Sequence, residues 1–455
     1  MIYSLLRSAA GIAVRWYYSD FTVVGADKVP VDGPMLVAVN HPNALVDVLA
    51  AARTVPRRLM FTAKATLFEN PLAAALLRAV GVLPLRRASD EAIKGGAVDP
   101  ARNAQSFDAI AEALRRSAAV LIFPEGKSHD EPAMAPARTG AARMVLHARD
   151  SRAVRGIRIV PIGLVFERKE RPRSRVVAIV GDPLDVDALA ADAKDPVQAI
   201  TAAIDASLRD LTLNYASTDD AERDARISRA LQALLRFDAP SIGEAESFRA
   251  RAEIARLLPS LRSALLRDDG LDQPRAAAFE AALIDFDQRL GKLRIALDDF
   301  SISREGGPGS IFVIRELGIL VATGPIALWG WINHVLPFRA ALLAGKRVRH
   351  TAADPAMRTI IAGAAFVLMM YMLQGAIVTL AFGPWWGLAY VLSLPVAADV
   401  NLRMEDRLRR ATRRARTYLR FRALPELQDE IMADARALRA EAISLARASG
   451  ITDVL

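Results

Sequence analysis

The chain has 455 residues, with 60 Lys and Arg against 51 Asp and Glu, so its formal net charge is +9. This length suits two or three domains, and a content of 52% hydrophobic residues excludes wholesale disorder. The chain has no cysteine, which excludes disulfides, a thiol nucleophile, Cys-ligated zinc and iron–sulfur clusters, and it has only five histidines for imidazole chemistry.

Residues 1–20 predict a helix that lies on a membrane surface. Apolar residues recur there at helical spacing, which is typical of an interfacial helix. Arg7 and Arg15 interrupt the apolar run and no clear cleavage site follows, so a signal peptide is not expected. A helix packed on the soluble domain is the alternative that the spacing leaves open.

Residues 21–190 predict an α/β domain. Strand-like apolar runs occur at Met35–Val39, Arg58–Thr62, Val80–Leu85, Ala118–Phe123, Ile157–Phe166 and Val176–Val180. Helical spacing lies between them at Ala44–Thr54, Pro71–Ala79, Asn103–Ser117 and Gly140–Arg149. Strands this apolar are covered on both faces, so we expect a mostly parallel sheet between helices. Pro161 suggests an edge strand or a bulge.

The segment that follows the first apolar run holds a histidine and an aspartate. His41 lies in the predicted loop, Asn43 is expected to cap the next helix, and Asp47 sits one turn into it. A carboxylate beside a histidine can fix its tautomer and raise its basicity, as in a catalytic base and its orienting partner. A loop histidine and a helix-start aspartate without a catalytic role are the alternative.

A second polar turn follows the run at Ala118–Phe123. Its Pro-Glu-Gly sequence can direct backbone N–H groups, with Lys127 or Ser128, toward an anion. The alternative is an ordinary turn that ends a strand. Arg87, at another predicted strand end, is suited to phosphate recognition, although paired arginines are more often solvated.

The remainder of the chain predicts helices and a membrane region. Residues 191–305 have helical spacing, and the glycine-rich segment Arg304–Gly309 is expected to be a linker before the membrane region. Within a membrane region over 310–400, residues 359–398 carry no charge, which predicts a transmembrane helical hairpin turning at Gly383-Pro384. Residues 317–338 are also uncharged, but Gly324-Pro325 favours a re-entrant or interfacial pair of half-helices over a full span. Residues 401–455 predict basic amphipathic helices broken near Pro425.

Four segments, taken together and in order, resemble the glycerolipid acyltransferase superfamily. They are His41 to Asp47, Gly81 to Arg87, Phe123 to Ser128 and Val160 to Ile162, and the resemblance covers roughly residues 20–185. This family includes glycerol-3-phosphate and lysophosphatidate acyltransferases. Five residues separate the histidine from the aspartate where four are common. This spacing is similar to the fungal-type glycerol-3-phosphate/dihydroxyacetone-phosphate branch and its bacterial relatives.

The resemblance implies a mechanism and a set of site residues. His41 would be the general base on a substrate hydroxyl and Asp47 would orient it, while acyl-CoA or acyl carrier protein serves as the acyl thioester donor. The resemblance further implies that a second group of residues binds the substrate phosphate and glycerol: Arg87, Glu125, Gly126, Lys127 and Ser128. No metal and no cofactor are expected, because a thioester is already activated.

The expected protein is an integral membrane acyltransferase of phospholipid synthesis that acylates glycerol-3-phosphate. We expect a bacterial inner-membrane location with the catalytic domain on the cytoplasmic face, since basic residues flank the uncharged stretches. The arginines over 403–416 would meet anionic lipid, and no nucleic-acid partner is expected. Two alternatives are a lysophosphatidate or lysophospholipid acyltransferase and an inactive lipid-binding scaffold.

Overall fold

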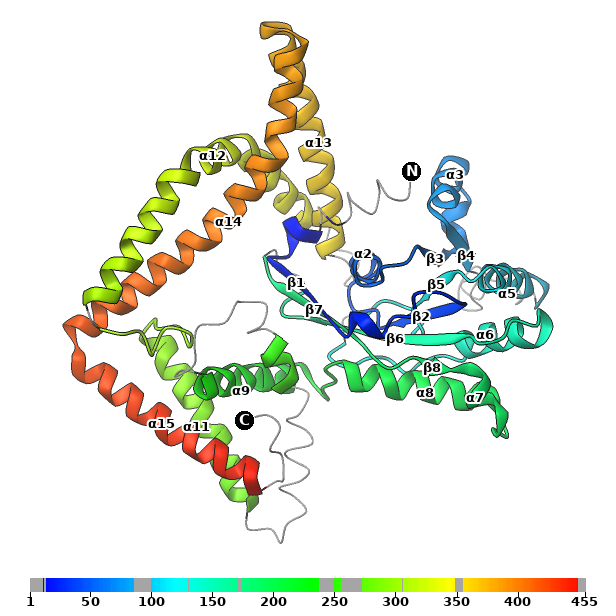
Figure 1. Ribbon diagram of the computed structural model, residues 1–455, viewed down its shortest axis with the longest axis horizontal. Coiled ribbons are helices and arrows are strands. Elements are labelled where there is room, and N and C mark those ends of the chain that lie inside the picture. Colours follow the sequence, from blue (N-terminus) through cyan, green and yellow to red (C-terminus); the bar gives the residue numbers. More distant parts are fainter. Residues whose placement is uncertain are drawn as a thin grey trace. The chain divides into compact units, whose positions relative to one another are not determined.

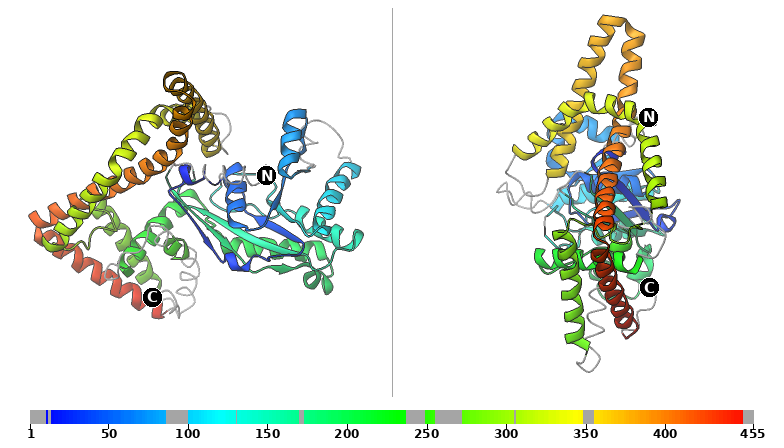
Figure 2. Two further views of the ribbon diagram at one scale, coloured as in Figure 1. Left: turned by 45° about the horizontal axis from the view of Figure 1, so that its top comes forward. Right: turned by 90° about the vertical axis from the view of Figure 1, so that its left-hand side faces the viewer.

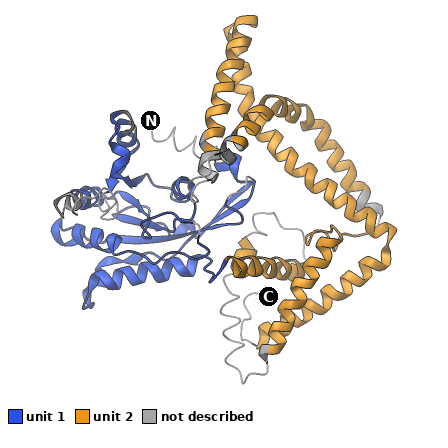
Figure 3. Cartoon of the chain, turned by 180° about the vertical axis from the view of Figure 1, so that it is seen from behind, with its two compact units in different colours: residues 1–217, 349–357 blue, residues 218–348, 358–455 orange. Residues whose placement is uncertain are grey.

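The computed structural model describes residues 11, 14–85, 100–129, 131–169, 173–236, 249–254, 272–304, 306–347 and 355–448. The chain forms two compact units, which Figure 3 shows in separate colours. The first contains residues 1–217 with 349–357, and the second contains residues 218–348 with 358–455. The main segment of the first unit thus ends at residue 217, within the region 191–305 that the sequence assigned to a separate helical segment.

A mixed, mostly parallel sheet forms the centre of the first unit (Figure 1). Its order is β1-β7-β6-β2-β5-β3-β4, and β8 pairs with β6. The strands are β1 Asp20–Val24, β2 Met35–Val39, β3 Leu59–Lys64, β4 Val82–Leu85, β5 Ala119–Ile122, β6 Arg158–Phe166, β7 Arg175–Val180 and β8 Leu184–Asp185. Among the described strands, β6 runs antiparallel to β7 and β8, and the other pairs are parallel. The predicted α/β class is therefore confirmed.

Both faces of the sheet are covered by apolar side chains. In β2, Leu36 and Ala38 join a cluster with one group of helices, while Met35, Val37 and Val39 join a cluster on the opposite face. Each of these five side chains is fully buried. The first cluster takes in α5 Pro100–Arg115, α6 Gly140–Ser151, α7 Val186–Ala191 and α8 Pro196–Leu211, and the second takes in α2 Leu45–Thr54. A strand with period-two side chains needs this double cover when every residue is apolar.

The expectation for Pro161 is wrong, because β6 is a central strand between β2 and β7. The pairing partner on one side changes at this residue: β8 pairs with Arg158 and Ile159, and β7 pairs from Ile162 onward. The Pro161 carbonyl still accepts a hydrogen bond from Gly181 N–H, at 2.9 Å. Since proline lacks only the donor, its position between two ladders keeps the sheet intact.

The start of the first unit contains the predicted interfacial helix and the strand β1. Residues 1–10 and 12–13 are outside the described part of the chain, so only residues 11 and 14–17 of that helix are described, and they are helical. Val14 and Tyr17 are buried, and the Tyr17 carbonyl accepts a hydrogen bond from Arg173 N–H at 2.5 Å. The next strand, β1, was not predicted. It is short and half-exposed at every position, so it lacks the apolar alternation by which strands are found.

Part of the second unit is a helical cluster with its own apolar core. The helices are α9 Thr218–Arg236, α11 Asp272–Lys292 and α15 Pro425–Ala448. Leu283, Phe286, Phe300 and Ile431 are almost fully buried in this core, together with Phe421. The helical content predicted after residue 191 agrees with this structure.

The uncharged stretches form three long helices of the second unit. They are α12 Gly306–Arg347, α13 Pro355–Phe382 and α14 Pro384–Ala423. In the described residues, Ser310–Ala340 and Ala362–Phe382 are long and apolar enough to cross a membrane. Figure 2 shows α13 and α14 side by side, and Gly383, with a φ of 96°, makes the turn between them as predicted.

Three predicted boundaries differ in the long helices. The helix α12 runs through Gly324-Pro325 without the expected break into half-helices, although its ribbon is bent (Figure 1). The expected linker residues Gly306 to Gly309 form its first turn, where proline is tolerated. The helix α14 continues from the uncharged stretch into the basic one, and ends at Ala423, before Pro425.

We predict that Gly163→Ala destabilises the first unit. A Cβ at Gly163 would overlap the carbonyl oxygen of Leu211, at the end of α8, so helix and strand would have to separate. Overpacking of this kind costs about 1–3 kcal/mol. The thermal unfolding midpoint should fall clearly for this variant. Gly140→Ala is the matched control, since a Cβ there meets no atom within 4 Å. Equal midpoints for the two variants would contradict the close contact.

Candidate functional site

The parallel pairing of β2 and β5 brings two loops together. Val37 lies opposite Leu121 and Ala38 opposite Ile122, an offset of 84 residues. The same offset continues past the strand ends, since the His41 N–H meets Glu125 and the Ala44 N–H meets Ser128. Carboxyl ends of neighbouring parallel strands lie at one edge of a sheet, which is where ligands bind in open α/β folds.

The His41 and Asp47 side chains form a hydrogen-bonded pair, as predicted. His41 Nδ1 lies 2.9 Å from Asp47 Oδ2, and the same oxygen accepts the Asn43 N–H at 2.7 Å. An ionised carboxylate can only accept, so Nδ1 carries the proton and Nε2 of the neutral ring is left with a free lone pair. Nε2 has no hydrogen-bond partner among the residues that the structure describes.

The ring of His41 is held by packing as well as by hydrogen bonding. It stacks on Phe123 with ring centroids 3.8 Å apart and planes 11° from parallel. Its side chain is 13% exposed, whereas Asp47 is fully buried. The ring therefore has one fixed orientation with a small exposed surface, an arrangement suited to a general base.

Asp47 is a buried carboxylate with unequal oxygens. Its Oδ1 is buried and has no hydrogen-bond partner in the described part of the chain. Burial raises the pKa of the Asp47 carboxyl above its ordinary value, and the opposing effects of the His41 ring and the Asn43 N–H do not cancel this rise. When Asp47 is ionised, its burial therefore costs the folded protein free energy.

The carboxylate of Glu125 connects the two loops. Its Oε1 accepts the His41 N–H at 2.5 Å, and its Oε2 accepts the Ala135 N–H at 2.8 Å and is also bonded to His129 Nε2. The side chain is 1% exposed. Both oxygens are engaged within the protein, so the structure shows Glu125 positioning the His41 backbone. The contact with glycerol that the sequence suggested stays a prediction.

The other residues of this turn lie beside His41. The Ser128 hydroxyl accepts the Ala44 N–H at 3.1 Å, and Ala44 has a φ of 47°, which is unusual for a residue with a side chain. Gly126, with a φ of 76°, is in the left-handed region, and Lys127 is exposed. Arg87 lies outside the described residues, so its expected part in phosphate binding is not described here.

Three polar residues that sequence reasoning did not place in the site support its loops. The Asn40 amide bonds both backbone groups of Leu164, donating at 3.1 Å and accepting at 2.7 Å. The Asn43 amide donates to the Tyr18 hydroxyl at 2.8 Å, and Lys169 Nζ donates to the Pro42 carbonyl at 3.2 Å. Asn43 is therefore not the expected helix cap. The cap position is Ala44, and the Asp47 side chain binds the Asn43 N–H instead.

The remaining histidines have other surroundings. His129 pairs with Glu125, and its neighbour Asp130 is outside the described residues. His147 pairs with Asp108 at 2.8 Å on the exposed side of α6 and α5. His334 is buried in α12 and bonds the Gly330 carbonyl and the Tyr371 hydroxyl. His350 is outside the described residues. His41 and His147 each bond a carboxylate through one ring nitrogen, but His41 is the one that lies at the carboxyl ends of the parallel strands, and its partner Asp47 is fully buried.

Comparison with known proteins identifies the domain that contains this pair. Residues 20–165 match the family model described as Acyltransferase. The chain is 36% identical over 85 residues to glycerol-3-phosphate O-acyltransferase 2 of Saccharomyces cerevisiae. The aligned segment covers 19% of this chain and 11% of that protein. It is 34% identical over 80 residues to glycerol-3-phosphate O-acyltransferase 1 of the same yeast, covering 18% and 10%.

Two further relatives match more of the chain at lower identity. An uncharacterized acyltransferase of Schizosaccharomyces pombe is 22% identical over 264 residues, covering 41% of this chain and 39% of that protein. The solved structure of the 1-acyl-sn-glycerophosphate acyltransferase PlsC from Thermotoga maritima is 16% identical, with a TM-score of 0.36, over 46% of this chain and 77% of that one. The match therefore spans from a tenth to two fifths of the length of the curated relatives. The resemblance found in the motifs is confirmed for the domain at residues 20–165, which matches the Acyltransferase family model.

Proposed function

We propose that this chain transfers a fatty acyl group from an acyl thioester, acyl-CoA or acyl carrier protein, to a hydroxyl of glycerol-3-phosphate. The observation that carries the proposal is the His41–Asp47 pair, whose Nε2 has no partner in the described part of the chain. The names of the two yeast relatives support glycerol-3-phosphate as the acceptor.

In the proposed reaction His41 acts as general base. Nε2 takes the proton of the acceptor hydroxyl while the hydroxyl oxygen forms a bond to the thioester carbonyl carbon. The carbon–sulfur bond of the resulting tetrahedral intermediate breaks, and the leaving thiolate takes a proton back from the imidazolium. Asp47 keeps Nδ1 protonated and stabilises the imidazolium charge. The step needs neither a covalent acyl-enzyme nor a metal or cofactor.

The turn after β5 holds the backbone of the loop that carries His41. Glu125 fixes the His41 backbone, and the Ser128 hydroxyl fixes Ala44, so displacement of either would move the base. We propose that Lys127, which is exposed, and the backbone at Gly126 contact the substrate phosphate together with Arg87. Phosphate needs cationic donors of this kind.

The long apolar helices support a membrane-bound enzyme. Two described helices are long and apolar enough to span a bilayer, and an acylated glycerol phosphate is an amphiphile that must reach a lipid leaflet. We propose an inner-membrane protein whose acyltransferase domain faces the cytoplasm, in phospholipid synthesis. The basic residues that follow the hairpin are typical of a cytoplasmic flank.

The first prediction concerns the base. Purified full-length protein should transfer a labelled long-chain acyl group from acyl-CoA, or from acyl carrier protein, to glycerol-3-phosphate. His41→Ala should lower this rate by about 10²–10⁴-fold, the usual contribution of a general base. His147→Ala, which removes an imidazole from the same unit without touching the site, should leave the rate unchanged.

The acceptor distinguishes the proposed function from its alternatives. Product formed from lysophosphatidate, and none from glycerol-3-phosphate, would make the protein a lysophospholipid acyltransferase. No product with either acceptor and either donor would favour an inactive lipid-binding protein. Full activity in His41→Ala would overturn the mechanism, whatever the acceptor.

The second prediction separates activity from stability at Asp47. The pKa of this carboxyl is raised in the folded protein, so above that pKa its ionised form costs the folded state free energy relative to the unfolded chain. Asp47→Asn removes the buried charge, and the thermal midpoint at neutral pH should be equal to or higher than that of the parent. The rate should nevertheless fall by roughly 10²-fold or more, because the protonated tautomer at Nδ1 is no longer enforced. A variant that keeps its activity, or that loses several degrees of stability, would contradict this assignment.

A further inference from the structure

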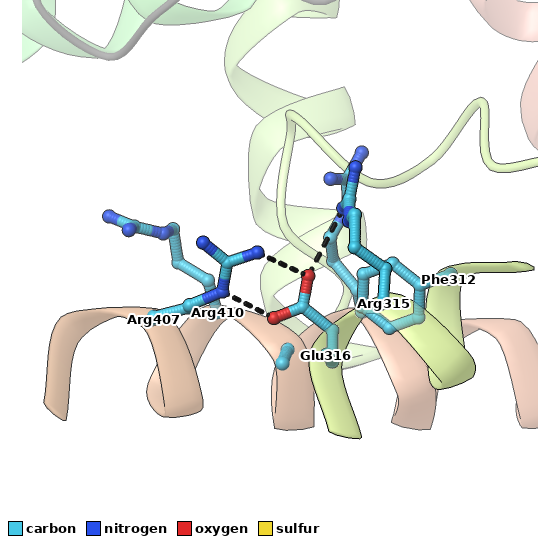
Figure 4. Close-up of a pocket in the computed structure, with 7 residues that line it drawn as sticks. Phe312, Arg315, Glu316, Arg407 and Arg410 are labelled. Atoms are coloured by element: carbon cyan, nitrogen blue, oxygen red, sulfur yellow. Dashed lines mark hydrogen bonds and ion pairs between the residues drawn. The ribbon is translucent and has the colours of Figure 1, made fainter. Parts of the chain in front are cut away.

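A pocket between α12 and α14, within the second unit, is lined by four arginines and one acidic side chain, Glu316, which Figure 4 shows bonded to Arg407 and Arg315. Its volume is about 310 Å³. The lining residues are Phe312, Arg315 and Glu316 from α12, and Arg407, Arg410, Ala411 and Arg414 from α14. We call it the Glu316 pocket. The acyl-transfer mechanism makes no use of it.

The contacts of Glu316 show which kind of ligand the pocket recognises. Its carboxylate receives two hydrogen bonds from Arg407, at 2.6 and 3.0 Å, and one from Arg315, at 3.1 Å. Guanidinium groups arranged around a small oxyanion in this way suit a carboxylate or a phosphate equally. The structure therefore already holds one anion in this position, supplied by the chain itself.

The side chains that line the pocket carry more positive than negative charge. Four guanidinium groups line it and one carboxylate lies among them. Arg414 also lies 3.3 Å from Asp299, but Arg413 shares that carboxylate at 2.7 Å. A surplus of positive charge in a concave site attracts a further anion.

The surroundings of the pocket favour a lipid over a soluble anion. It lies where the uncharged stretch of α12 begins, at Leu317. Neighbouring apolar side chains on α12 are strongly exposed: Ile311 is 69%, Ile314 71% and Leu317 57% exposed. A soluble phosphate gains nothing from such neighbours. A phospholipid presents a phosphate and acyl chains together, so it matches both the arginines and the apolar surface.

We propose that the Glu316 pocket binds the phosphate group of an acidic phospholipid, and that Glu316 competes with this phosphate for the arginines. The lipid would be a bound neighbour of the enzyme, not its substrate. This inference does not depend on the proposed acyl transfer.

The test is a titration of full-length protein in a nonionic detergent, followed by calorimetry. The probe is dioctanoyl phosphatidylglycerol, an acidic lipid that is neither substrate nor product of the proposed reaction. Dioctanoyl phosphatidylcholine and inorganic phosphate are the comparison ligands. We expect phosphatidylglycerol to bind at least tenfold more tightly than either, and His41→Ala to bind it as the parent does.

Two variants should change the affinity in opposite directions. Arg410→Gln removes a lining cation and should weaken phosphatidylglycerol binding by about tenfold, as the loss of one charge-assisted hydrogen bond implies. Glu316→Gln removes the competing charge and should tighten binding several-fold. Arg403→Gln is the matched control: this arginine lies on the same helix, pairs with Asp399 and does not line the pocket.

Three outcomes would overturn the inference. Equal weakening by Arg403→Gln and Arg410→Gln would show a general electrostatic attraction without a site. Inorganic phosphate that binds as tightly, with the same dependence on Arg410, would make the ligand a soluble phosphate. Weaker binding by Glu316→Gln would show that the carboxylate builds the pocket and does not compete for it.

Discussion

The parallel register between β2 and β5 is the constraint on which the site depends. It places residues 84 positions apart at the same level of the sheet, and this relation persists for six residues beyond the paired strands. Two loops that are distant in sequence thereby act as one structure, tied by the Glu125 carboxylate and the Ser128 hydroxyl.

Two features of the site lower the stability of the folded protein. Asp47 is fully buried, with one oxygen that has no partner among the described residues, and Ala44 adopts a backbone conformation that a side chain disfavours. Both features cost stability, and well-packed neighbours offset them. Leu36 and Val37, on opposite faces of the adjoining strand, are fully buried. Such local costs are characteristic of functional sites, where a charge or a backbone angle is held for chemistry.

The sequence predicted the parts of the fold that periodic apolar patterns define. The five strands from β2 to β6, together with β7, were found from such runs, as were His41 with its carboxylate partner and the turn at Gly383. It did not predict β1, because an edge strand that is half-exposed on both faces has no alternation. The prediction that Asn43 caps the helix was wrong because tertiary contacts use its groups. Its side chain bonds Tyr18, and its backbone N–H bonds Asp47. The predicted break at Gly324-Pro325 was wrong. A proline removes one backbone hydrogen bond, and the long helix α12, packed along α14, tolerates this loss.

The continuity of α14 has a mechanical consequence. One unbroken helix carries the uncharged residues up to Ala398 and also Phe421, whose ring is part of the core formed with α9, α11 and α15. At 1.5 Å per residue these two points are about 35 Å apart. The helix therefore acts as a rigid connection. The helical cluster cannot move relative to the apolar segment unless backbone hydrogen bonds of α14 break. The length of α14 thus sets the distance between the helical cluster and the apolar segment.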